Sequence, residues 1–279
     1  MKNNRLNLIK NTLKHNIAQV IAVTEKDVKL ELRFKLQIIV NYINPIITIL
    51  MPLIVFQALF NTNESYGPWT PENYAVFILS AYNLTLLKNT IKGFPEQLRR
   101  EKFWKTLPAL IIAPFNRIDL LLGIFLTNII LISVPFALFL IITLILYPIS
   151  FWTLLFILFI YLLIALIFSG IGLLLGVFAI SKENMWRVLL LFLDLIFWAS
   201  CLSYPFALFP SIFQIVILLN PLYYIFTFLR MAWIDNNVIH TFMNFYPHFI
   251  ILLAIAIVLP LITVYIFNRI FRKYGIVGY

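Results

Sequence analysis

Residues 120–147 read LLLGIFLTNIILISVPFALFLIITLILY, and after the turn Pro148-Ile149-Ser150, residues 151–180 read FWTLLFILFIYLLIALIFSGIGLLLGVFAI. Both stretches lack charged residues and exceed the roughly 20 apolar residues that a helix needs to cross a membrane. The whole chain of 279 residues is 62% hydrophobic and 11% charged, whereas a soluble domain is about 45–50% apolar and about 25% charged. The sequence therefore predicts an all-α polytopic membrane protein, and it excludes an ordinary soluble globule or a disordered chain.

Six membrane spans are predicted from apolar stretches of sufficient length: residues 36–60, 74–92, 120–147, 151–180, 188–208 and 249–267. A seventh apolar stretch, residues 211–233, carries Asn220-Pro221 in its middle, and proline breaks a helix interior. We therefore expect residues 209–234 to form an external re-entrant helical hairpin between spans 5 and 6. Residues 36–279 then make a single six-span domain.

Basic residues set the predicted orientation, because positively charged loops stay in the cytoplasm. With six spans both termini are cytoplasmic, and of the 21 Lys and Arg residues only Arg230 lies outside. The net charge of +10 thus reports membrane orientation and does not predict nucleic-acid binding. We expect the protein in the cytoplasmic membrane of a prokaryote, in contact with membrane lipids.

Residues 1–35 are predicted to form a basic amphipathic helix. Apolar side chains recur at three- and four-residue steps on one face: Leu6, Ile9, Leu13, Ile17 and Val20. Such a helix lies in the membrane interface; the alternative is a soluble helix that packs on a partner.

Several kinds of chemistry have no motif in this sequence. It contains no G-x-x-x-x-G-K-[ST] phosphate loop. Its three histidines show no metal-ligand spacing, and its single cysteine excludes a cysteine-based metal cluster. We therefore expect no cofactor, metal or catalytic set on this chain.

A charged segment after span 2, residues 95–106, is predicted to be a short cytoplasmic helix. Pro95 can start a helix, and Glu101 and Lys105 have the spacing of an i,i+4 pair. If the chain is a transporter, it must receive mechanical work from another chain because it has no phosphate loop, and a rigid charged helix is a suitable receiver. The alternative is a solvated basic loop that only enforces topology. The candidate coupling residues are Glu96, Arg99, Arg100, Glu101, Lys102 and Thr106.

Two motifs resemble the type-2 exporter permeases of the ABC transporter superfamily. Between spans 2 and 3 the motif residues occur in the family's order: Glu101, Thr106-Leu107, Ile111-Ile112, Pro114, Arg117 and Gly123. The family often has Gly where Lys105 stands. The second motif, Asn220-Pro221-Leu222-Tyr223-Tyr224 followed by Arg230, is similar to the family's external hairpin.

The resemblance implies a permease subunit that acts as a homodimer with two copies of a cytoplasmic ATP-binding subunit, which would hold ATP and Mg. It implies a conduit formed mainly by spans 1, 2 and 5. The compact size and the N-terminal helix resemble the branch that exports polysaccharides, teichoic-acid-like polymers or lipid-linked oligosaccharides. Drug and lipid exporters share the first motif, so they remain an alternative.

Polar and aromatic side chains in the spans are candidates for a substrate path: Asn41, Tyr42, Phe56, Asn83, Asp194, Tyr204 and Tyr224. Asp194 is the only carboxylate deep within a span, and a charge there costs about 2.5–3.5 kcal/mol on the insertion scale. It is either a pathway or gate residue or a structural partner of Asn83 or Asn128. Most of the aromatic residues also fit an interfacial belt.

Span 4 contains Gly172-Leu-Leu-Leu-Gly176, a pattern that lets two helices approach closely. We interpret it as packing within one subunit.

Two other functions are alternatives. An integral membrane enzyme that modifies lipids or sugars needs a cluster of catalytic groups, but the predicted external side offers only Glu64, Glu72, Asp235, Arg230 and two histidines. A secondary transporter predicts inverted repeats and more charges within the spans, which are not evident in the sequence.

Overall fold

The computed structural model describes residues 2–60, 67–105, 117–181 and 185–273. The regular elements in these parts are helical, which confirms the predicted all-α class. In chain order they are α1 (Lys2–Arg33), α2 (Lys35–Phe60), α3 (Tyr74–Phe103), α5 (Arg117–Leu146), α6 (Phe151–Ser181), α7 (Met185–Trp198), the 3-10 helix η1 (Phe206–Leu208), α8 (Ser211–Leu218), α9 (Pro221–Asp235), α10 (Val238–Asn244) and α11 (Tyr246–Lys273).

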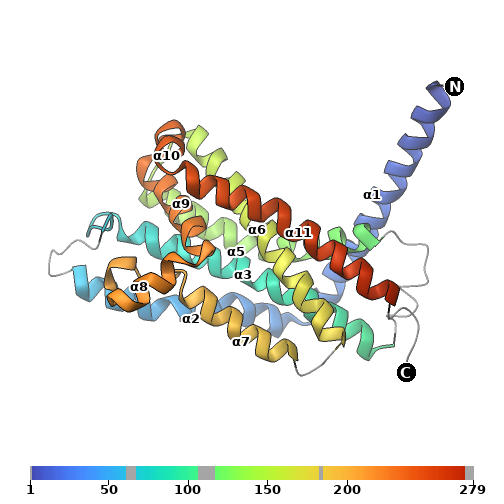
Figure 1. Ribbon diagram of the computed structural model, residues 1–279, viewed down its shortest axis with the longest axis horizontal. Coiled ribbons are helices and arrows are strands. Elements are labelled where there is room, and N and C mark those ends of the chain that lie inside the picture. The colour runs from blue at the N-terminus through green and yellow to red at the C-terminus, as the bar shows by residue number, and fades with distance from the viewer. Residues whose placement is uncertain (1, 61–66, 106–116, 182–184, 274–279) are drawn as a thin grey trace.

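The long helices form a bundle with α3 and α6 at its centre (Figure 1). α6 packs against α3 on one side and α11 on the other, and α3 also contacts α2, α5 and α9. Both central helices bury large apolar side chains, among them Leu84 and Leu86 of α3 and Ile164 and Phe168 of α6. The bundle therefore has a continuous apolar core between α3 and α6, while α2, α5 and α11 expose apolar side chains outward.

Within the described parts of the chain, three helices are long and apolar enough to cross a membrane: Ile118–Leu146, Phe151–Ala179 and Tyr246–Ile270. Taken together, α8 and α9 pass the same test, so the pair could make a fourth crossing. The chain bends by 89° between the two helices. The break falls at Asn220-Pro221, as the sequence predicts. These findings confirm a multi-pass membrane protein. The count of six spans and the re-entrant path stay predictions.

Span 5 was predicted to run from residue 188 to 208, but α7 ends at Trp198. The backbone then turns through Cys201, which has a φ of 55°, and Pro205 precedes η1. A left-handed residue and a proline both interrupt helical geometry. The prediction of one continuous helix through this segment was therefore wrong.

The prediction of a separate helix beginning at Pro95 was also wrong, because α3 continues through Pro95 to Phe103. A proline inside a helix frees the carbonyl four residues earlier, here that of Ile91. This carbonyl faces α6 so closely that a Cβ at Gly172 would lie 2.6 Å from its oxygen. A Cβ at Gly176 would lie 2.9 Å from Leu98. The two glycines thus let α6 pack against the proline-containing part of α3, which confirms packing within one subunit.

Another close approach joins α1 to α5. A Cβ at Gly123 would lie 2.5 Å from the side chain of Val23, and the Thr24 hydroxyl donates to the Gly123 carbonyl at 3.3 Å. Figure 1 shows the N-terminal part of α1 projecting away from the bundle. Ile17 on the predicted apolar face is 57% exposed, and the placement of α1 in a membrane interface stays a prediction.

Candidate functional site

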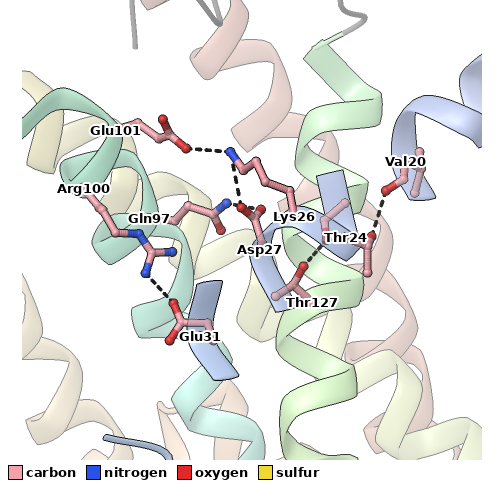
Figure 2. A network of polar contacts seen from close by, with 10 residues as sticks. Val20, Thr24, Lys26, Asp27, Glu31, Gln97, Arg100, Glu101 and Thr127 are labelled. Atoms are coloured by element: carbon pink, nitrogen blue, oxygen red, sulfur yellow. Dashed lines mark hydrogen bonds and ion pairs between the residues drawn. The ribbon is translucent and has the colours of Figure 1, made fainter. Parts of the chain in front are cut away.

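The last turns of α3 carry most of the predicted coupling residues. Residues 97, 100 and 101 share one face because they are three and four positions apart, and α1 lies against that face (Figure 2). Along α1, Asp27 and Glu31 are also one turn apart. The two helices thus present complementary polar side chains to each other.

Polar contacts join the two helices. Lys26 Nζ donates to Glu101 Oε1 at 2.8 Å, and Arg100 Nη1 donates to Glu31 Oε1 at 2.6 Å. Between these ion pairs, Gln97 Nε2 donates to Asp27 Oδ2. We call this set, Lys26, Asp27, Glu31, Gln97, Arg100 and Glu101, the α1–α3 network.

The network is largely shielded from solvent at its centre. Asp27 is 0% exposed, and Gln97 and Glu101 are each 6% exposed. Breaking a buried ion pair leaves a charge without its compensating partner, which is strongly destabilising. The network therefore resists separation of α1 from the end of α3.

Burial sets the ionisation of the central groups. It raises the pKa of Asp27, although the Lys26 ammonium, the Gln97 hydrogen bond and the Arg100 charge oppose this rise. Burial by itself lowers the pKa of Lys26, but the hydrogen bond to Glu101 and the charges of Asp27 and Glu101 outweigh it, so the pKa is raised overall. The Asp27 carboxyl therefore costs free energy when it ionises, and Lys26 is held in its charged form.

The other predicted coupling residues differ in their surroundings. Arg99 is exposed and Lys102 is half-buried, whereas Thr106 lies outside the described residues. Glu96 lines a pocket between α2, α3 and α5. The surrounding protein desolvates its carboxyl and, together with the charge of Glu31, raises its pKa against the opposing charge of Lys92. The coupling role of this set stays a prediction.

The helix ends in an exposed aromatic turn. Phe103 is 83% exposed and Trp104 is 44% exposed, and the Arg100 guanidinium lies 5.6 Å from the Trp104 ring. Lys105 follows with a φ of 58°, a left-handed conformation that glycine adopts most easily. This explains why the exporter family often has a glycine where this chain has Lys105.

Asp194 has a partner that the sequence analysis did not foresee. Its Oδ1 accepts a hydrogen bond from Lys88 Nζ at 2.6 Å, and that ammonium lies 4.5 Å from the centre of the Phe197 ring. The prediction that Asp194 pairs with Asn83 or Asn128 was therefore wrong. Lys88 belongs to the residues predicted for span 2, so two opposite charges within predicted spans were the signal that could have found the pair.

The substrate-path candidates do not form one cluster. Phe56 is 1% exposed and packs in the core, with its ring 5.5 Å from Phe77 and 6.1 Å from Tyr204. Asn83 is also buried, at 1% exposed. The Tyr224 hydroxyl donates to the Leu218 carbonyl at 2.8 Å, within the α8–α9 unit.

Only two of these candidates, Asn41 and Tyr42, line a polar pocket, which lies between α2, α3 and α5. The Tyr42 hydroxyl also donates to the Leu131 carbonyl of α5. These two residues therefore belong to a different part of the molecule from Phe56, Asn83 and Tyr224.

The hairpin motif has a structural role in this chain. Asn220 caps α9 by accepting from the Leu222 amide at 3.0 Å, and it donates to the Ile196 carbonyl of α7 at 2.6 Å. Pro221 occupies the first turn of α9, where its missing N–H costs nothing. The motif thus fixes the angle between α8 and α9 and attaches them to α7.

Arg230 is buried at 2% exposed. Its guanidinium donates to the carbonyls of Cys201 and Leu202 at 2.8 and 2.6 Å and to Ser80 Oγ at 3.2 Å, and it lies 3.6 Å from the centre of the Phe77 ring. It therefore fixes the turn after α7 against α3. Arg230 is therefore a buried packing group, and its place on the external side stays a prediction.

The model of the ABC-2 type transporter family matches residues 18–233. The matched range includes the α1–α3 network, the Lys88–Asp194 pair and the Asn220-Pro221 cap. No curated protein matches the chain.

Proposed function

The chain belongs to the ABC-2 type transporter family, and from that premise we propose that it is the permease subunit of an ATP-driven exporter whose ATP is hydrolysed on a separate chain. Membership makes it a membrane subunit of a transporter, and the family implies an ATP-binding partner. We propose two copies of the permease and two of the ATPase, with ATP and Mg on the ATPase, six spans in each permease and both termini in the cytoplasm.

The α1–α3 network is the observation that carries the proposed coupling. The exposed surface at the end of α3, with Arg99, Phe103 and Trp104, is available to a cytoplasmic partner. Force applied there moves α1 as well, because Arg100 and Glu101 are joined to α1 by ion pairs. Coupling in this proposal thus has two parts, a docking surface for the ATPase and a network that passes the motion on.

The proposed cargo is a polysaccharide or lipid-linked glycan. Amide and hydroxyl side chains can bond sugar hydroxyls, and Asn41 and Tyr42 present such groups in a polar pocket. A drug or lipid cargo is the alternative that the transport experiment must distinguish.

The test is reconstitution of this chain in proteoliposomes with the ATP-binding subunit that co-purifies with it. We expect ATP-dependent movement of a polyprenyl-linked oligosaccharide but not of a fluorescent phospholipid or a cationic dye. Movement of the phospholipid or the dye alone would refute the glycan cargo, and no ATP-dependent movement of any of the three would refute the exporter.

The network is tested in the same vesicles by charge reversal. Arg100→Glu should lower transport per ATP hydrolysed, and adding Glu31→Arg should restore it, because the pair at 2.6 Å is re-formed with opposite sign. Arg269→Glu, at an exposed cation of α11, is the matched control. Failure of the second change to restore coupling would show that Arg100 acts through the ATPase instead.

A further inference from the structure

The short helix α10 lies at the end of the bundle that is remote from α1 (Figure 1). Candidate membrane spans begin or end at the same level, because α5 ends at Leu146, α6 begins at Phe151 and α11 begins at Tyr246. The rings of Phe156 and Phe249 lie 6.4 Å apart, so the first turns of α6 and α11 are side by side. Since a span ends where the hydrocarbon ends, α10 lies close to one surface of the membrane.

The surface of α10 is divided into three faces. Thr241 is fully buried and faces the protein, where α10 contacts α6, α9 and α11. His240 and Asn244, four positions apart, form a polar face that is exposed. The third face is apolar and also exposed, and it consists of Ile239, Phe242 and Met243, of which Ile239 is 67% and Met243 is 71% exposed. A helix with an apolar and a polar exposed face is of the kind that lies along a membrane surface.

The apolar face of α10 continues onto the exposed side of α11. The Phe242 ring lies 5.2 Å from the ring of Phe249 in the first turn of α11. Tyr246, Ile250 and Ile257 of α11 are exposed as well. Because α11 is long and apolar enough to cross the membrane, its exposed apolar side chains face lipid. The continuous apolar surface indicates that the same lipid covers α10.

Hydrogen bonds fix the orientation of α10. The Asn237 side chain caps its first turn. The Thr241 hydroxyl donates to Asp235 Oδ2 at the end of α9, at 2.9 Å. The Asn236 side-chain oxygen accepts from the Ser150 amide in the turn between α5 and α6, at 2.7 Å. The apolar face of α10 therefore cannot turn toward the protein without breaking these contacts.

The charge of this region indicates which property of a lipid matters. Residues 231–268 contain no Lys or Arg, and Asp235 is the only acidic residue among them. His240 Nδ1 lies 3.3 Å from Asp235 Oδ2, so this carboxylate offsets any positive charge on the ring. Binding of an amphipathic helix to a membrane grows with its buried apolar area and with its attraction to anionic lipids. In α10 only the first of these contributions is available.

We propose that α10 is a membrane-interface anchor. Its apolar face inserts between the acyl chains just below the lipid head groups, and its polar face stays among the head groups and water. Because Thr241 is bonded to Asp235, the anchor fixes the depth of the last turn of α9 in the membrane. The occupant of the apolar face is the lipid surface rather than a second copy of the chain, and the proposal depends on neither the cargo nor the ATPase.

The experiment is site-directed spin labelling of the full chain in liposomes. The unmodified chain gives the background, since its single cysteine, Cys201, is buried. The reference within the hydrocarbon is Ile257→Cys, about 16 Å along α11 from its first residue. The test variants carry one nitroxide each, on the apolar face of α10 or on its polar face as the matched control: Ile239→Cys and Met243→Cys, and His240→Cys and Asn244→Cys.

Power-saturation EPR compares collisions of each nitroxide with oxygen, which dissolves in acyl chains, and with a nickel chelate, which stays in water. We expect the labels at positions 239 and 243 to lie about 5–10 Å below the head-group boundary, with more access for oxygen than for nickel. The labels at positions 240 and 244 should be open to nickel, and the label at position 257 should lie deeper. These depths should be the same in vesicles of phosphatidylcholine alone and in vesicles that also contain phosphatidylglycerol.

Three results would overturn the proposal. Equal nickel access on the two faces would place the apolar face in water. Shielding of positions 239 and 243 from both reagents would show that protein covers them, whether a second copy or another part of this chain. A depth that required phosphatidylglycerol would replace apolar insertion by recognition of an anionic head group. Two positions on each face, each checked for wild-type elution in size-exclusion chromatography, keep the test decisive if one variant does not fold.

Discussion

The contact between Lys26 and Glu101 gives a quantitative test of the α1–α3 network. Two unit charges 2.8 Å apart interact by about 1.5 kcal/mol at the dielectric constant of water and by about 6 kcal/mol at an effective value of 20. The Lys26 side chain is 42% exposed and that of Glu101 is 8% exposed. Solvent screening and desolvation therefore place the expected coupling energy near the lower value, at about 1–2 kcal/mol.

A double-mutant cycle measures this energy. Lys26→Gln, Glu101→Gln and the double variant are unfolded in mixed micelles with increasing SDS, and helix content is followed by circular dichroism. We expect Lys26→Gln to cost more than Glu101→Gln, because it removes a partner from the more deeply buried charge. Lys29→Gln is the matched control, since the Lys29–Glu25 pair at 2.5 Å is exposed on both sides.

Additivity of the two single changes within about 0.5 kcal/mol would refute the reasoning. The two side chains would then not stabilise each other, and the network would not join α3 to α1. A Glu101→Gln variant with unchanged stability but uncoupled ATP hydrolysis would instead place Glu101 in contact with the ATPase.

Four further changes have defined outcomes. Lys105→Gly should stabilise the protein by up to about 1 kcal/mol in the same unfolding assay, because it removes the strain of a left-handed residue, and a loss of stability would contradict this. Gly172→Ala should destabilise by about 1–3 kcal/mol, since its Cβ would lie 2.6 Å from the Ile91 oxygen; a neutral effect would show that α6 is not held there. Burial raises the folded-state pKa of Asp27, so the stability due to this group is complete below the unfolded value of about 4 and is lost as pH rises through the folded pKa. Stability measured from pH 4 to pH 7 should therefore shift in favour of Asp27→Asn relative to wild type, and a shift the other way would exclude a buried, costly carboxylate. Asp194→Asn should lower transport in the proteoliposomes more than expression, and the reverse would assign the residue a structural role only.

Most of the helices followed from long apolar runs, the exception being residues 188–208, where α7 ends at Trp198. The effect of a proline did not follow from the sequence in every case. Asn220-Pro221 separates α8 from α9 by 89°, as the helix-breaking rule predicts. Pro95 lies inside α3 under the same rule. The difference is tertiary, because α6 packs against Pro95 through Gly172 and Gly176. A local rule cannot include a neighbour that is more than 70 positions away in the chain.

The sequence predicted which residues belong to the candidate site but not which of them contact one another. Glu101 was expected to pair with Lys105 on one helix face, yet Lys105 lies beyond the end of α3, and Glu101 pairs with Lys26 of α1. Charge counting treated Lys88 and Lys26 alike as cytoplasmic cations. Their roles depend on which helices pack together, and that information is absent from the periodicity of either segment.

The polar contacts of α3 are arranged along its length in a way that suits transmission of force. Ser80 bonds Arg230 near one end, Lys88 bonds Asp194 in the middle, and Gln97, Arg100 and Glu101 bond α1 at the other end. At 1.5 Å per residue, Ser80 and Glu101 are about 32 Å apart along the helix, close to the thickness of a hydrocarbon core. A helix of this length displaced at its charged end also moves its contacts with α7 and α9. Because Arg230 fixes the turn after α7 to α3, that displacement reaches the α8–α9 unit without a further moving part.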